Sequence, residues 1–157
     1  SILDQRPEKL MAPFCQKHGM HLLTYGTLLG GFLSEKYLDS QEPHRADLTN
    51  YSLQKYYDVI NAWGGWSLFQ ELLFTLSKIA KKHDSNIANV ATKFILDKPA
   101  VAGVIIGVKL GISEHRKNNI HVFDLQLDSE DHTMINSITK KSNNLFDIIG
   151  DCGDEYR

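Results

Sequence analysis

Two glycine-containing segments each follow a stretch that favours a β-strand. Residues 20–25 (MHLLTY) run into GTLLGG at 26–31, and the apolar, β-branched residues 101–106 (VAGVII) run into GVKLG at 107–111. Ligands of parallel α/β folds collect at the carboxyl ends of the strands. Both segments are therefore candidate ligand-binding loops.

The second loop has the residue types of a phosphate site. A helix is expected over about 113–121 with Ser113 as its N-cap, and the backbone N–H groups at a helix start attract anions. Lys109 would add a positive charge beside them. The alternative is a solvated Lys109 and a simple turn at Gly107, and the local residues alone do not decide between the two.

The remaining reactive side chains do not form a site. Cys15 and Cys152 are the only cysteines, and nothing in the sequence supplies Cys15 with a base. Gly19 separates His18 from His21 and breaks the regular face that a metal would need. The sequence predicts no metal site, and most of the histidines are expected at the surface.

Helices dominate the elements that would position these loops. The strongest pattern is an apolar stripe over residues 67–82, and residues 101–106 are expected to form a strand covered on both faces. The WGGW segment at 63–66 is expected to pack both indoles between two helices. The other expected elements are a strand tail at 1–3, a strand at 20–25, and helices at 7–18 (ended by Gly19), 52–62, from the Asn86 cap to near Pro99, 113–121, and 129–141 (capped by Asp128 or Ser129).

Composition excludes several classes of protein. The 157 residues suit a single domain, and 17 Lys and Arg against 19 Asp and Glu give a formal charge of −2, which argues against nucleic acid as a partner. A mean hydropathy of −0.28 without a long apolar run argues against a membrane span. Two cysteines and no secretory signal favour the cytoplasm, and the missing initiator Met suggests a processed or truncated product.

The order of elements predicts an α/β fold with parallel strands. Only two and a half strands are visible, which is too few for a covered sheet or a closed barrel. The sequence therefore behaves as part of a larger fold, and open strand edges lead us to expect self-association or a missing amino-terminal half. A stand-alone flavodoxin-like domain is rejected, because no phosphate loop follows a first strand.

Two stretches resemble the aldo-keto reductase family. LLTYGTLLGGFLSEKY is similar to the signature Y-S-P-L-G-x-G-F-L-T-G-K-Y at the end of that family's seventh barrel strand. GVIIGVKLGISEHRKNN is similar to its eighth strand and cofactor loop, and a family-like DSED helix follows. The resemblance implies the carboxyl-terminal part of a TIM-type (β/α)8 barrel, a helix-rich partial barrel from the end of strand six to the last helix.

The resemblance also implies a binding site for NADP. Tyr25 matches the aromatic residue that stacks on the nicotinamide ring, Lys109 the basic residue at the 2′-phosphate, and Asn119 the asparagine near the adenine. The sequence departs from the family pattern at Thr27 and Ile106, where proline is usual. The implied cofactor-binding residues are Tyr25, Gly26, Thr27, Leu28, Gly107, Lys109, His115 and Asn119.

No residue of this chain matches the family's catalytic Asp, Tyr, Lys and His, which belong to the amino-terminal half. The first hypothesis is a carboxyl-terminal fragment of an NADP(H)-dependent reductase whose complete form transfers hydride to a small aldehyde or ketone. The alternative is a non-enzymatic, truncated family member that acts in interaction or regulation.

Overall fold

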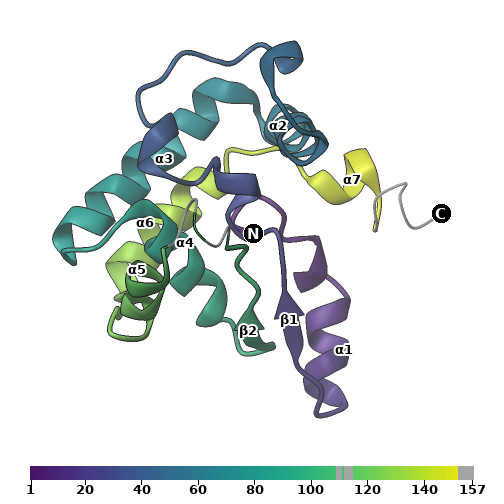
Figure 1. Cartoon of the computed structure of the whole chain (residues 1–157). Coiled ribbons are helices and arrows are strands. Elements are labelled where there is room, and N and C mark those ends of the chain that lie inside the picture. The colour runs from purple at the N-terminus through teal and green to yellow at the C-terminus, as the bar shows by residue number, and fades with distance from the viewer. Residues whose placement is uncertain (109–110, 112–114, 152–157) are drawn as a thin grey trace.

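The computed structural model describes residues 1–108, 111 and 115–151, in which two short strands lie between α1 on one side and α4 on the other (Figure 1). The strands are β1 (Leu22–Thr24) and β2 (Val101–Val104). The helices are α1 (Met11–Lys17), α2 (Tyr51–Trp63), α3 (Gly65–Lys82), α4 (Ile87–Leu96), α5 (Arg116–Ile120), α6 (Ser129–Thr139) and α7 (Leu145–Ile149).

The two strands pair in parallel, as the sequence predicts. Leu23 lies opposite Gly103 and Thr24 opposite Val104, with an irregularity in the register after Leu22. The Ile105 amide donates to the Thr24 carbonyl at 2.7 Å, so the pairing continues past the strand end. The loops that follow β1 and β2 therefore leave the sheet at the same end, next to each other.

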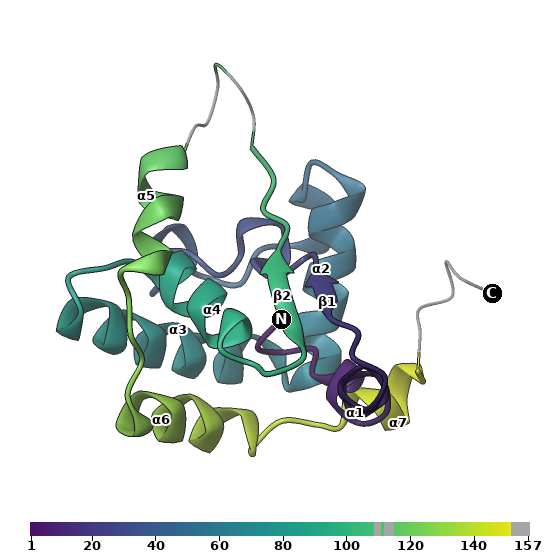
Figure 2. The same cartoon turned by 90° about the horizontal axis from the view of Figure 1, so that it is seen from below.

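The core lies among the helices rather than within the sheet. α3 packs against α2, α4 and α6, and α4 packs in turn on β2 (Figure 2). The apolar stripe of α3 is fully buried at Phe69, Leu72 and Leu76, because residues three and four apart share one helix face. The expected helix over 67–82 is confirmed, and it begins two residues earlier.

The predicted strand at residues 1–3 is wrong. Ile2 and Leu3 are buried, but the segment turns: the Asp4 amide donates to Ser1 Oγ at 3.0 Å, and the Gln5 side chain donates to the Ile2 carbonyl at 2.9 Å. These local hydrogen bonds replace the ladder that a strand would need. The helix predicted over 7–18 is likewise divided into a 3₁₀ turn at Arg6–Glu8 and α1.

β2 is shorter and more exposed than predicted. It ends at Val104, and the Ile105 side chain is 59% exposed. A parallel strand is fully covered only when neighbours and helices flank it on every side. β2 has one strand neighbour among the described residues, so the expectation of a strand buried on both faces is wrong.

Three helix ends follow the caps predicted at Gly19, Asn86 and Asp128. Gly19 has φ +66°, and beyond it the Met20 amide donates to the Cys15 carbonyl at 2.8 Å, which closes α1. The Asn86 side chain accepts from the Asn89 amide at the start of α4. Asp128, rather than Ser129, caps α6. The helix α7 has no counterpart in the sequence analysis.

The two tryptophans pack where α2 meets α3, as expected. Trp63 and Trp66 are 1% and 7% exposed, and the Trp66 indole N–H donates to the Ser40 carbonyl at 3.1 Å. The Trp66 ring centroid lies 5.3 Å from that of Phe69. Burial and a satisfied polar atom give this segment a structural role.

A charged cluster joins the end of α3 to the start of α6. Asp131 is fully buried and accepts hydrogen bonds from Lys82 Nζ at 2.9 Å and from the Asp128 amide at 3.0 Å. The Nε2 atom of the His83 ring lies 2.7 Å from the second carboxylate oxygen of Asp131. Burial disfavours the charged form of Asp131, but the hydrogen bonds from Lys82 and His83 outweigh this effect and hold the pKa of Asp131 below its usual range.

Replacing Asp131 with Asn should lower stability most at neutral pH. A carboxyl whose pKa is lowered by folding stabilises the fold above its unfolded pKa of about 3.9, and this contribution is lost as the pH falls through the lower folded pKa. We expect a loss of about 2 kcal/mol in the free energy of unfolding at pH 7. The loss should shrink between pH 5 and pH 2, as measured by urea denaturation.

Asp58→Asn is the matched control. Asp58 pairs with Arg45 at 2.8 Å, but both side chains are about half exposed, so their pairing contributes little to stability. The role given to the buried carboxylate would be contradicted if Asp58→Asn and Asp131→Asn lowered the free energy of unfolding equally. It would also be contradicted if the loss of stability in Asp131→Asn did not change with pH.

Candidate functional site

The loops after β1 and β2 form the candidate site. The hydrogen bond from the Ile105 amide to the Thr24 carbonyl holds the two strand ends together, so residues 25–28 and 105–108 leave the sheet side by side. Tyr25 is 62% exposed, and Ile105 and Val108 are 59% and 42% exposed. An aromatic ring with apolar neighbours at a strand end offers a surface on which a planar ligand can stack.

Gly26 and Gly30 in the first loop leave room for the side chain of Tyr56. A Cβ at Gly26 would overlap the hydroxyl of Tyr56 in α2, and one at Gly30 would lie 3.1 Å from the Tyr56 ring. Both glycines also have positive φ, at +67° and +66°. The close approach of Tyr56 therefore accounts for glycine at both positions, a role that the sequence analysis missed.

The residues between these glycines point inward. Thr27 is 1% exposed, its Oγ1 has no hydrogen-bond partner among the described residues, and Leu28 packs against the core. The backbone forms a tight turn in which the Leu29 amide donates to the Gly26 carbonyl at 3.0 Å, with Leu29 at φ +51°. Of the four residues predicted here, Tyr25 alone presents a largely exposed side chain.

The second loop is described only in part. Gly107 is exposed beyond β2, whereas Lys109 and Ser113 lie outside the described residues. α5 begins at Arg116, so the helix predicted over 113–121 starts later, and its N-cap is His115 rather than Ser113. The Asn119 amide donates to the His115 carbonyl at 2.8 Å, which places both residues on the first turn of α5.

Asn89 fixes α5 against the helix bundle. It is 3% exposed on α4, and its side-chain amide donates to the Asn118 carbonyl at 2.8 Å. A buried amide needs such a partner, because an unpaired one would be costly to bury. The sequence carried a signal for this contact, namely an asparagine inside an apolar helical face, but it did not identify the partner.

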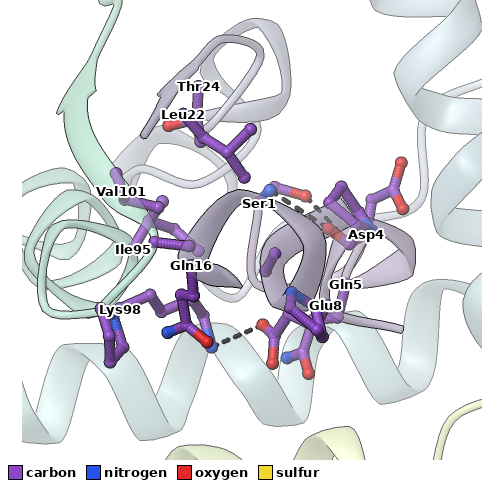
Figure 3. A pocket seen from close by; sticks show the side chains of 15 residues that line it. Ser1, Asp4, Gln5, Glu8, Gln16, Leu22, Thr24, Ile95, Lys98 and Val101 are labelled. Carbon is purple, nitrogen blue, oxygen red and sulfur yellow. Dashed lines mark hydrogen bonds and ion pairs between the residues drawn. The ribbon is translucent and has the colours of Figure 1, made fainter. Parts of the chain in front are cut away.

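A cavity of about 250 Å³ has no residue of either loop in its lining (Figure 3). It is bounded by α1 and by the first residues of the strands, Leu22 and Val101. Lys98 and Glu8 form an ion pair of 2.6 Å at its wall. Among the described residues no cluster of His, Cys, Asp or Glu could hold a metal ion, and no helix there is both long and apolar enough to cross a membrane.

Comparisons with known proteins point to one family. The family model "Aldo/keto reductase family" matches residues 1–140. Protein tas of Escherichia coli is 30% identical over 131 residues, which cover 83% of this chain and 35% of that protein. Flagellar radial spoke protein 5 of Chlamydomonas reinhardtii is 36% identical over 85 residues, covering 53% of this chain and 16% of that protein.

Two solved structures share the fold. A glycerol dehydrogenase from Gluconobacter oxydans has a TM-score of 0.68 at 21% identity, over 89% of this chain and 40% of its own. A thermostable aldo-keto reductase in complex with the inhibitor epalrestat has a TM-score of 0.56 at 24% identity, over 87% of this chain and 36% of its own. The fold is thus part of a TIM-type (β/α)8 barrel, and the chain spans well under half the length of these relatives.

Gly26→Ala should destabilise the chain more than Gly19→Ala. Both glycines have nearly the same positive φ, which costs an alanine about 1 kcal/mol, but a Cβ at Gly19 meets nothing within 4 Å, whereas one at Gly26 overlaps Tyr56. Chemical denaturation of both variants measures the difference.

A Tyr56→Phe background tests the cause. Removing the hydroxyl relieves the overlap, so Gly26→Ala should lower the free energy of unfolding less in this background than in the wild type. Gly19→Ala should lower it by the same amount in both backgrounds. If Gly26→Ala costs no more than Gly19→Ala in the wild type, the close approach of Tyr56 does not require this glycine.

Proposed function

Because the chain belongs to the aldo/keto reductase family, we propose that it carries the cofactor-binding end of a reductase that transfers hydride between NADP(H) and a small aldehyde or ketone. The observation that carries this proposal is the family match over residues 1–140, combined with the pairing that sets Tyr25 beside the loop after β2. When bound, the cofactor supplies the hydride, and this chain's residues hold and orient it.

The described residues fit the nicotinamide end of such a cofactor. The exposed Tyr25 ring would stack on the nicotinamide and select the face that delivers hydride. Thr27 is buried and Leu28 packs inward, so we propose that the loop from Gly26 to Leu28 supports the pyrophosphate through its shape rather than its side chains. Gly107, Lys109, His115 and Asn119 are proposed for the adenosine end.

The reaction also needs a proton donor for the carbonyl oxygen. No residue of this chain matches the four that the family uses, so we propose that residues 1–157 act as a single binding unit and that the acid comes from the part of the barrel that the chain does not match. We propose the cytoplasm as its location, in keeping with only two cysteines.

A second candidate function is a role in interaction or regulation. It is favoured by the 36% identity to a protein named for the flagellar radial spoke rather than for a reaction. The exposed apolar side chains of α1 and β1 also suit a role in assembly, since Met11, Phe14 and Leu23 are each more than half exposed. Binding of NADPH by the chain separates the two candidates, because only the first requires it.

The first prediction from this proposal concerns cofactor choice. Lys109→Met should reduce the affinity for NADPH roughly tenfold to hundredfold and leave the affinity for NADH nearly unchanged, because only NADPH carries the 2′-phosphate. Titration calorimetry with each cofactor at two salt concentrations measures this, since a phosphate contact weakens as ions screen it. Lys78→Met, at an exposed position of α3, is the matched control. If Lys109→Met lowered the affinity for NADPH and for NADH equally, Lys109 would support the loop instead of contacting the phosphate.

The second prediction concerns turnover. The purified chain should not oxidise NADPH in the presence of a simple aldehyde, because it lacks the family's proton donor and the lysine that tunes it. The absorbance of NADPH at saturating aldehyde measures the rate. Sustained turnover that co-purifies with the chain would require an acid within these residues and would overturn the division of roles proposed here.

A further inference from the structure

The first turn of α4 contacts the segments that follow both candidate loops. The Ile87 amide donates to Glu35 Oε1 at 2.7 Å, and Glu35 lies in a 3₁₀ turn shortly after the first loop. The Asn89 side-chain amide donates to the Asn118 carbonyl at 2.8 Å, and Asn118 lies in α5, which follows the second loop. One helical turn therefore bonds to both segments.

This turn lies at the end of the sheet where the two loops begin. α4 packs on β2, and residues 97–100 join the end of the helix to the start of the strand (Figure 2). The helix therefore runs back along the strand, and its first turn lies toward the carboxyl end of β2. Asn89 is 3% exposed, so it lies at the ligand end of the fold but is covered by the chain itself.

α5 depends on such contacts for its position. None of the residues 116–120, all of which the structure describes, is buried. A helix of this length is not stable by its own hydrogen bonds, so packing must hold it. The buried Val122 anchors the 3₁₀ turn that follows α5 and packs on α4, and the bond from Asn89 holds the helix itself.

Asn89 can hold α5 in place because Asn89 is itself fixed. Its backbone amide donates to Asn86 Oδ1 at 2.8 Å, and its neighbours Ile87 and Val90 are fully buried. A buried side-chain amide without a partner is costly, so the Asn118 carbonyl keeps this side chain in one orientation. Leucine has nearly the same size, so the hydrogen bond is what asparagine adds at this position.

We propose that Asn89 is a positioning residue for the adenosine end of the cofactor, because it holds in place the helix that carries His115 and Asn119 at its start. This inference rests on the proposed function, which assigns those two residues to the adenosine end. The Asn119 amide donates to the His115 carbonyl at 2.8 Å, so both residues move with α5. A helix that has lost the bond from Asn89 must be ordered by the ligand, which weakens binding.

The experiment compares the whole cofactor with its adenosine end on the full chain. Titration calorimetry with NADPH and with adenosine 2′,5′-bisphosphate measures both affinities. Asn89→Leu should lower both by the same factor, about fivefold to tenfold, because one hydrogen bond is lost and it acts on the adenosine end alone. The emission spectrum of NADPH bound at saturation should not change, since the nicotinamide would lie at Tyr25. Asn89→Gln keeps the donor and should recover part of the affinity.

Asn86→Ala is the matched control. Asn86 caps α4 in the same turn, so this variant lowers stability without removing a bond to α5. It should bind both ligands with the affinity of the wild type. Hydrogen exchange without ligand gives a second readout: the Asn119 amide should exchange faster in Asn89→Leu than in Asn86→Ala.

Four results would overturn the inference. They are an affinity for the bisphosphate that Asn89→Leu leaves unchanged, an equal loss in Asn86→Ala, exchange at the Asn119 amide that Asn89→Leu does not accelerate, and a failure of both Asn89→Leu and Asn89→Ala to fold. If the wild-type chain binds neither ligand, the proposed function fails and the inference fails with it. If the wild type binds both ligands and the variants bind equally well, the inference fails alone.

Discussion

The parallel pairing of β1 and β2 is the constraint on which the candidate site depends. These strands are far apart in the sequence, and the helices α2, α3 and α4 between them form the core on which the sheet rests. The hydrogen bond between the Ile105 amide and the Thr24 carbonyl extends the pairing beyond β2. The pairing of the strands therefore sets the loop that carries Tyr25 beside the loop that begins at Ile105.

The packing of α2 against the first loop fixes the shape of that loop. Tyr56 approaches Gly26 and Gly30 so closely that side chains there would displace it, and Thr27 and Leu29 are buried beneath. A loop held from within by α2 need not be ordered by its ligand, which lowers the entropic cost of binding. The exposed ring of Tyr25 thus projects from a rigid support.

Locally encoded features could be predicted from the sequence, whereas features that depend on distant contacts could not. The stripe of α3 and the caps at Gly19, Asn86 and Asp128 follow from residues within a few positions of one another. The asparagine cap of α7 offered the same kind of signal and was overlooked. The burial of Thr27, the approach of Tyr56 and the partner of Asn89 depend on packing between elements, which periodicity does not report. The family resemblance supplied the fold, because two strands alone do not indicate a barrel.

The proposed division between cofactor binding and chemistry fits the fold. In a (β/α)8 barrel the site is assembled from loops after several strands, so no pair of adjacent strands holds all of its groups. β1 and β2 contribute Tyr25 and the loops beside it, so in the reductase proposed above the proton donor would lie after another strand of the barrel.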